Sequence, residues 1–175
     1  MKDTFEKLSA MLAEIKIPAK LTEEKDMLTL LLPEEIAGPD VYGYVFFVPF
    51  SEDGDEGGYY MIRFELLDTL KLSGDDQQRL ASAVSMINPV LYAGGYALTG
   101  YTPQTATDPE TKSLIYQISI PVAFKPKNEW LLEELMLSIK VSAAVLKKSA
   151  PLLLDVAAQK TSVKDLLEGL YIQGE

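Results

Sequence analysis

The 175-residue chain contains no cysteine and no histidine. Without cysteine it can form neither disulfide bonds nor thiolate metal sites, which suits a reducing cytoplasm. Without histidine it lacks the usual general base, the usual metal ligand and the side chain that changes charge near neutral pH. The composition therefore argues against an enzyme that depends on a thiol, an imidazole or a protein-bound metal, and we expect no cofactor.

Basic residues are also few, at 16 against 26 acidic residues, which gives a formal net charge of −10. Nucleic acids and anionic membranes would repel such a chain, so we expect neither as a partner. The acidity favours solubility, and it would also suit a protein partner with basic segments. No apolar run approaches the roughly 20 residues of a membrane span, and the N-terminal stretch MKDTFEKLSAMLAEI is charged and amphipathic, unlike a signal peptide. We expect a cytoplasmic location.

What is present indicates one globular domain over residues 1–175. The hydrophobic content of 47% is typical of a globular protein. The chain is long enough to bury a sizeable core. It contains no internal repeat, domain linker or low-complexity segment.

The stretch from Ile87 to Ala158 organises the rest of the chain. Apolar and polar residues alternate over Tyr96–Tyr101 and again over Leu114–Val122, which predicts two half-buried strands. The Pro-rich and Thr-rich stretch TPQTATDPET between them predicts a solvated hairpin loop. Gly94 and Gly95 before the first strand indicate a tight turn rather than a phosphate cradle, because no P-loop pattern follows them.

Past Pro126 the period becomes helical. One apolar stripe contains Leu131, Leu132, Leu135, Met136, Ile139, Ala143 and Leu146. Pro151 removes a backbone donor and clashes with the preceding turn. Because apolar residues resume after it, we expect a kinked continuation of the long helix rather than a break.

The remaining elements follow from the same periodicities. An amphipathic helix is predicted at the N-terminus, with Asp3-x-x-Glu6 as a capping box, and PEEIAGPD is predicted to be a connection. Further strands are predicted at Met27–Leu32, Val41–Phe50 and Tyr60–Leu67. Capping patterns at Ser73-x-x-Asp76 and Ser162-x-x-Asp165 predict a helix that ends at Ile87 and a short C-terminal helix.

This order, α-β-β-β-α-β-β-α with a short extra C-terminal helix, predicts an α+β fold. Strands that follow one another in runs between helices indicate an antiparallel sheet flanked by helices, not a wound parallel sheet.

The stretch Val41–Phe50 is the densest apolar segment, and both of its faces are apolar. Val45 and Phe47 would point one way, and an aromatic set would point the other. Such a strand is covered on both sides by its own chain or lies at an interface with a partner. On the second alternative, the partner-binding residues are Tyr42, Tyr44, Phe46 and Phe50.

Two weaker patterns concern a possible calcium site and possible catalytic pairs. Asp53, Asp55 and Glu56 lie in the acidic stretch SEDGDEGG, but the twelfth position from Asp53 is Phe64 rather than a bidentate glutamate, so an acidic hairpin tip is a better interpretation than a calcium loop. The Ser/Lys pairs Ser138–Lys140 and Ser162–Lys164 are two residues apart and would not share a helix face, whereas Thr161 and Lys164 could.

Several of these patterns resemble the YbjN-like family of proposed bacterial sensory-transduction regulators, within the type III secretion chaperone-like fold. The matching residues are Ile87-Asn88 at the end of a helix, Pro89 and Tyr92 before a strand, the strand Leu114–Val122, and the long helix with Glu133 and its leucines. Pro151 and the extra C-terminal helix depart from the usual pattern. The resemblance implies a small, cytosolic, non-enzymatic protein, often dimeric, of a class that chaperones extended secretion substrates or acts in regulation. It contributes no catalytic residues.

The sequence thus favours a non-enzymatic protein-binding module, chaperone-like or regulatory, that engages a protein or peptide through apolar surface of the sheet or helices or at a strand edge. One alternative is a homodimeric structural or regulatory protein without a peptide client, in which the apolar strand or the helix Asp76–Ile87 meets its copy. Another is an enzyme that uses carboxylates. No catalytic, cofactor-binding or metal-binding residue is predicted.

Overall fold

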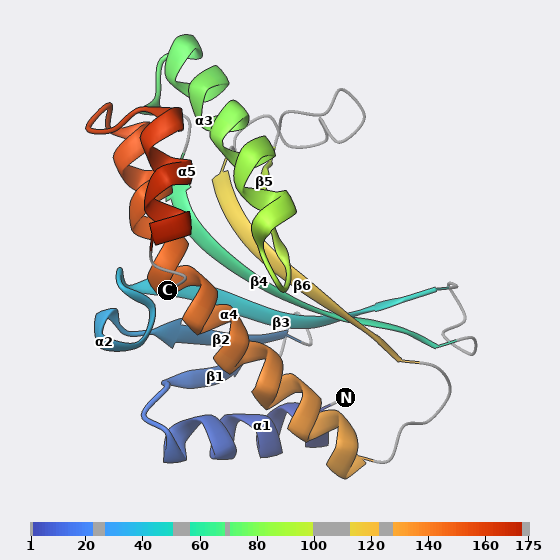
Figure 1. The fold of residues 1–175 in the computed structure, drawn as a ribbon. Coiled ribbons are helices and arrows are strands. Elements are labelled where there is room, and N and C mark those ends of the chain that lie inside the picture. The colour runs from blue at the N-terminus through green and yellow to red at the C-terminus, as the bar shows by residue number, and fades with distance from the viewer. Residues whose placement is uncertain are drawn as a thin grey trace.

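The computed structural model describes residues 2–22, 27–50, 57–68, 71–99, 113–122 and 128–172. These residues form six strands, five α-helices and one short 3₁₀ helix (Figure 1). In chain order the elements are α1 (Lys2–Glu14), β1 (Ala19–Thr22), β2 (Met27–Leu32), α2 (Glu34–Ala37), β3 (Val41–Pro49), β4 (Gly58–Asp68), α3 (Gly74–Ile87), η3 (Asn88–Val90), β5 (Gly95–Leu98), β6 (Ser113–Val122), α4 (Asn128–Ala157) and α5 (Val163–Ile172).

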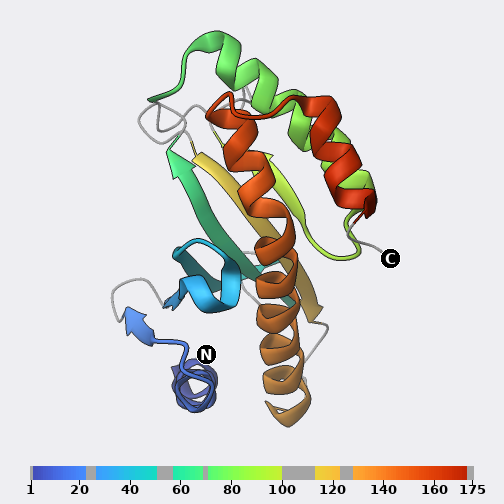
Figure 2. The same ribbon diagram turned by 60° about the vertical axis from the view of Figure 1, so that its left-hand side comes forward.

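The strands form one sheet in the order β1-β2-β3-β4-β6-β5, and every pair of neighbours is antiparallel. Helices α1, α3, α4 and α5 lie on one face of this sheet, so the described residues make two layers (Figures 1 and 2). The predicted fold class, an α+β fold with an antiparallel sheet and flanking helices, is confirmed.

Helix α4 lies at the centre of the helical layer and contacts α1, α2, α3, α5, β4 and β6. The predicted apolar stripe of this helix is buried: Leu131, Leu132, Leu135, Met136, Ile139, Ala143 and Leu146. Alternate residues of the strands supply the other half of the core, among them Leu28, Val45, Ile62 and Tyr116. Burial of each large apolar side chain stabilises the fold by about 1.5–3 kcal/mol, so this contact is the main source of cohesion between the layers.

Helix α4 runs on through Pro151, as the apolar pattern beyond that residue predicts. Proline has no backbone N–H, so it cannot donate to the carbonyl of Lys147 one turn earlier. The turn after α2 packs at this point. A Cβ on Gly38 (φ +91°) would lie 3.5 Å from Pro151 Cγ and 3.6 Å from the Lys147 carbonyl oxygen. Lys147 Nζ in turn donates to the carbonyl of Glu35 at 3.1 Å, so α2 is tied to α4 where the helix lacks a bond.

Buried hydroxyl groups fix how α4 sits on the sheet. Ser149 of α4 donates to the carbonyl of Val145 at 2.7 Å, and its oxygen lies 2.6 Å from the hydroxyl of Tyr96 on β5. Because the single Ser149 proton goes to Val145, the Tyr96 hydroxyl is the donor to Ser149. Nearby, the Tyr116 hydroxyl donates to the carbonyl of Ala93 at 2.7 Å. These bonds leave the two tyrosines satisfied inside an apolar core.

The free edge of β5 is closed by a side chain. Asn88 accepts from the backbone N–H of Tyr96 at 2.8 Å and donates to the carbonyl of the same residue at 2.9 Å. The amide thereby takes the place of a neighbouring strand. At the opposite edge of the sheet, Ser9 of α1 donates to the carbonyl of Ala19 in β1 at 3.1 Å. An edge strand with occupied backbone groups is a poor template for another strand.

Several local predictions are confirmed. Ser73 and Ser162 accept from the N–H groups of Asp76 and Asp165 at 3.2 and 3.1 Å, so both capping patterns form. Gly94 has a φ of +63°, and a Cβ there would collide with the Tyr116 hydroxyl. This is the tight turn expected before β5. The predicted hairpin loop between β5 and β6 lies outside the described residues.

Other local predictions are wrong. Strand β1 was not predicted, and the predicted connection PEEIAGPD contains the short helix α2. Asp3 lies inside the first turn of α1, where its carboxylate pairs with Lys7 at 2.9 Å instead of capping the helix. The alternation in β4 is broken by a bulge between Glu65 and Leu67, which places Leu67 opposite Leu114. An extra residue in one strand shifts every later side chain to the other face, which period-two reasoning cannot anticipate.

We predict that stability falls at alkaline pH through the buried tyrosines. Burial raises the pKa of Tyr96 and raises the pKa of Tyr116 to about 12. In the unfolded chain both would ionise near pH 10, whereas the folded protein keeps their protons. The free energy of unfolding should therefore hold below about pH 10 and fall as pH rises from about 10 to 12, by about 1.4 kcal/mol per pH unit for each such residue.

Urea unfolding at increasing pH measures this slope, and Tyr96→Phe is the matched control. That variant loses the bond to Ser149 at every pH, but its stability should fall less steeply with pH because one ionising group is gone. An equal slope in Tyr96→Phe and the wild type would contradict the assignment of the slope to this residue.

A second prediction concerns the closed edge of β5. Asn88→Ala should destabilise the fold by about 1–3 kcal/mol, because both backbone groups of Tyr96 lose their partner. It should also promote concentration-dependent self-association, since the freed edge can pair with another chain. Urea unfolding and light scattering measure the two effects. Asn88→Asp keeps the acceptor and loses the donor, so its free energy of unfolding should lie between those of the wild type and Asn88→Ala. Wild-type stability in Asn88→Ala would show that the edge is not held by this side chain.

Candidate partner-binding surface

The face of the sheet opposite the helices has no covering layer among the described residues (Figures 1 and 2). The strand register defines which side chains lie on it. One row of Cα partners runs Leu31, Tyr42, Glu65, Ile115 and Ala97, the next runs Thr29, Tyr44, Arg63 and Gln117, and a third runs Met27, Phe46, Met61 and Ser119. We call the surface made by these three rows, together with Val48, Tyr59 and Pro121 at one end, the outer face.

The outer face brings the sequence-predicted residues together. Tyr42, Tyr44 and Phe46 follow one another at every second position of β3, and Phe50 comes directly after that strand. Tyr42 is 65% exposed and Phe50 57% exposed, while Tyr44 and Phe46 are half-buried. On the inner face of the same strand Val45 is fully buried. The two sides of β3 that look alike in sequence are therefore in different environments, core on one side and open surface on the other.

Arg63 lies in the middle row of this face. Its guanidinium carbon is 5.6 Å from the centroid of the Phe46 ring, a cation–π contact. Its Nε is buried and has no hydrogen-bond partner among the described residues. Two residues along the same strand lies the exposed Glu65. Burial, and secondly the charge of Glu65, raise the pKa of Tyr44. This part of the face therefore has apolar rings beside one positive and one negative charge.

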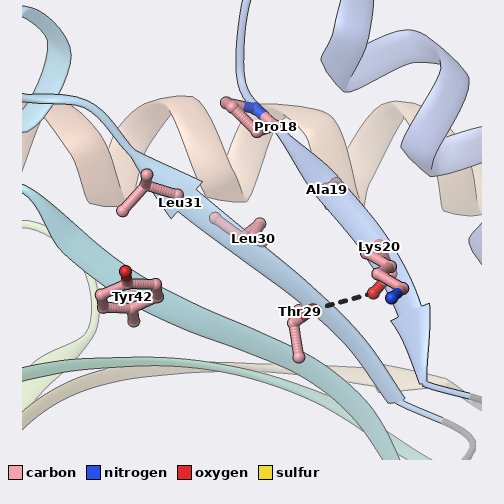
Figure 3. A pocket seen from close by; sticks show the side chains of 7 residues that line it. All are labelled: Pro18, Ala19, Lys20, Thr29, Leu30, Leu31 and Tyr42. Carbon is pink, nitrogen blue, oxygen red and sulfur yellow. Dashed lines mark hydrogen bonds between the residues drawn. The ribbon is translucent and has the colours of Figure 1, made fainter.

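A shallow hollow of about 200 Å³ lies at the corner of the outer face next to strand β1 (Figure 3). It is lined by Pro18, Ala19 and Lys20, by residues 29–31 of β2, and by Tyr42. Thr29 and Lys20 are joined across the floor, where Thr29 Oγ1 donates to the Lys20 carbonyl at 2.9 Å. The side chain of Tyr42 stands at one end of this hollow and α4 passes behind the strands, on the other side of the sheet (Figure 3).

Most of the outer face was not predicted from the sequence. Tyr59, Met61 and Arg63 of β4 and Ile115 of β6 share it with the aromatic residues of β3. Alternation within the predicted strand Tyr60–Leu67 puts Met61 and Arg63 on one side of that strand. It could not show that this side meets Phe46 and Tyr44, because pairing between strands depends on register and not on local pattern.

The residues weighed for catalysis do not form a site. Ser138 is buried in α4, whereas Lys140 of the same helix is exposed. Lys164 is exposed on α5, a short helix whose first turn is occupied by its own cap. Asp53, Asp55 and Glu56 lie outside the described residues. Within the described ranges no group of three or more acidic side chains could hold a metal ion.

A polar hollow of about 360 Å³ lies where α5 begins, beside α3. Its charged groups already have partners. Arg79 pairs with Asp76 at 3.0 Å, and Asp76 also accepts from Gln159 at 2.8 Å. The pKa of Asp76 is lowered, first by the hydrogen bond from the Ser73 hydroxyl and then by the bond from Gln159 and the charge of Arg79. The arrangement ties α3 to the turn before α5 and presents no free charge aimed at a ligand.

Other exposed apolar side chains are scattered over the helices. Trp130 and Leu137 lie on α4, and Met86, Val90 and Tyr92 lie at and beyond the end of α3. Single exposed apolar residues are ordinary on protein surfaces. None of the helices in the described part of the chain is both long and apolar enough to cross a membrane.

Comparison with known proteins supports the fold. No protein-family model matches the chain, and no curated protein matches it in sequence. Among solved structures, it is similar to the crystal structure of YbjN, a proposed transcription regulator from E. coli, with a TM-score of 0.50 and 15% identity over 84% of this chain and 91% of that one. It also matches a chain of the ExsC–ExsE complex, with a TM-score of 0.42 and 15% identity over 83% of this chain and 92% of that one. The resemblance to YbjN predicted from the sequence is thus confirmed as a likeness of fold.

The exposed aromatic side chain of Tyr42 should contribute little to the stability of the isolated chain. We expect Tyr42→Ser to change the free energy of unfolding by no more than about 0.5 kcal/mol, because the side chain is mostly exposed. Val45→Ser, three residues along the same strand but on the inner face, should cost about 2–4 kcal/mol through lost burial and an unsatisfied hydroxyl. Urea unfolding of the two variants tests the difference. A cost for Tyr42→Ser as large as that for Val45→Ser would mean that the outer aromatic residues are part of the core.

Proposed function

We propose that this chain is a non-enzymatic protein-binding module, chaperone-like or regulatory, and that it engages a protein or peptide partner across the outer face of its sheet. We further propose that it acts as a single domain over residues 1–175 and works in the cytoplasm. The partner-binding residues are Tyr42, Tyr44, Phe46 and Phe50.

One observation carries this proposal: strand β3 presents aromatic side chains to open surface. Tyr42 and Phe50 are more than half exposed, although the sheet needs only its inner face to pack against α4. A sheet face that served solubility alone would be polar at these positions. Aromatic residues are the side chains that protein interfaces favour, because each covers a large area at a small entropic cost.

The closed edges of the sheet favour binding on the face over binding at an edge. A partner segment that added itself as a strand beside β5 would have to displace the two bonds between Asn88 and Tyr96. Beside β1 it would compete with the bond from Ser9 to Ala19. Tyr42 and Phe50 are already exposed, and a partner that covers them breaks no bond of the fold.

A homodimer is the second candidate, and the charges near the middle of the face support it. Arg63 and Glu65 lie two residues apart on the same strand and point the same way. A two-fold axis between two such faces would set Arg63 of each copy against Glu65 of the other. The size of the face counts against this candidate. Its rows hold somewhat fewer side chains than the roughly 20–30 residues that each partner contributes to a standard interface.

Affinity capture from native cell extract, followed by mass spectrometry, tests the proposed function. The tagged wild-type protein should recover a specific protein, and Tyr42→Asp should lose at least about nine-tenths of it, because a buried unpaired charge disrupts an apolar contact. Leu137→Asp is the matched control, since it adds the same charge at a residue that is 55% exposed on α4. It should capture as much as the wild type.

Equal capture by Tyr42→Asp and Leu137→Asp would contradict binding through the outer face. Light scattering at micromolar concentration decides the second candidate. A wild-type dimer that Tyr42→Asp converts to a monomer, with no specific protein captured, would favour the homodimer over a partner-binding module.

A further inference from the structure

The hollow beside Tyr42 is the place on the outer face where a partner side chain could sink below the surface. It is bounded by apolar parts of Pro18, Ala19 and Leu31, with the aliphatic stem of Lys20 on one side (Figure 3). Its volume of about 200 Å³ is below the range of about 300–1,000 Å³ that small-molecule and cofactor sites occupy. A hollow of this size and polarity suits one bulky apolar side chain rather than a metabolite.

The aromatic row that leads away from the hollow indicates the conformation of the occupant. Tyr42, Tyr44 and Phe46 point outward at every second residue of β3, which repeats at about 6.8 Å. An extended segment has the same repeat, so its alternate side chains could meet the hollow and the rings beyond it in step. A helix would present its side chains at a different spacing.

The net charge of the chain indicates the charge of the occupant. The whole chain carries a net charge of −10, and Glu65 is an exposed carboxylate of the outer face. The cations there are Lys20, which lines the hollow, and Arg63 in the middle row. A segment with basic residues would be attracted at long range by the net negative charge, and one of its basic residues could pair with Glu65.

We propose that this hollow is the anchor subsite of the outer face, and that it takes one bulky aliphatic or aromatic side chain from an extended, net-basic segment of a partner protein. The inference rests on the proposed function, because it names the chemistry of the partner that the same surface would bind. The apolar side chain supplies the affinity in the hollow, and the flanking basic residues, attracted by the net negative charge of this chain, supply the preference among partners.

Fluorescence anisotropy with designed peptides tests the proposal. The probe is a fluorescein-labelled nine-residue peptide with leucine, phenylalanine and leucine at alternate positions, serine between them and lysine at both ends. A second peptide has glutamate in place of lysine, and a third has alanine in place of the apolar residues. The lysine-ended peptide should bind at least about tenfold more tightly than the alanine peptide, which has no bulky apolar side chain to bury in the hollow. It should also bind several-fold more tightly than the glutamate-ended peptide, because the chain carries a net charge of −10.

Variants of the protein locate the anchor. Thr29→Phe fills the hollow from its floor and should weaken binding of the lysine-ended peptide at least about tenfold. Ser119→Phe makes a comparable change at an exposed position of β6 on the same face but away from the hollow, so it should weaken binding less than Thr29→Phe does. Glu65→Gln removes the exposed carboxylate of the outer face and should weaken binding several-fold and reduce its dependence on salt, whereas Glu133→Gln on the exposed side of α4 should change neither. Circular dichroism of each variant confirms that it is folded.

The remaining outcomes would overturn the inference in distinguishable ways. Equal weakening by Thr29→Phe and Ser119→Phe would show that the peptide covers the face without an anchor in the hollow, and the proposed function would stand. Equal binding of the lysine-ended and glutamate-ended peptides would refute the basic partner. A wild-type protein that binds none of the peptides would refute the anchor subsite, while the capture experiment would still decide the proposed function independently.

Discussion

The packing of α4 on the inner face of the sheet is the contact on which the rest of the structure depends. This helix touches every other α-helix in the described part of the chain as well as strands β4 and β6. Its buried stripe matches the alternate buried residues of the strands, so two different periodicities meet at one interface. The hydroxyl of Tyr96 bonded to Ser149 sets where along the sheet the helix lies. Each of the other helices, α1, α2, α3 and α5, contacts α4, while α1 also contacts β1 and β2 and α3 also contacts β5.

A single helical layer covers only one side of a sheet, and this constraint leaves the outer face open. Strands of an antiparallel sheet with one solvated side normally alternate between apolar and polar residues. Strand β3 does not: Val45 is buried on one side while Tyr44 and Phe46 stand on the other. Those rings lie outside the contact with α4, so packing of the helical layer does not require them. Their presence fits the proposal that a second molecule covers this face.

Periodicity foretold most of the fold because burial imposes it residue by residue. The stripe from Leu131 to Leu146 and the alternation from Leu114 to Val122 follow directly from which side chains must avoid water. Strand β1 was missed because four residues between Pro18 and the next segment are too few to show a period. The bulge after Glu65 was missed because it is a property of pairing. Sequence could name Tyr42 and Phe46 as sharing a face, but whether another layer covers that face is decided by topology, which local pattern does not encode.

The edges of the sheet also bear on the proposed binding surface. Backbone groups at an edge attract any extended chain regardless of its sequence, and here Asn88 occupies both backbone groups of Tyr96 in β5 while Ser9 occupies the carbonyl of Ala19 in β1. Selective binding must then come from side chains, and those are displayed on the outer face. Arg63, stacked on Phe46 with an unpaired Nε, and the hollow beside Tyr42 give that face features that a plain apolar surface lacks. On the proposal that the outer face binds a partner, an open face with partly occupied edges would select that partner by its side chains rather than by its backbone.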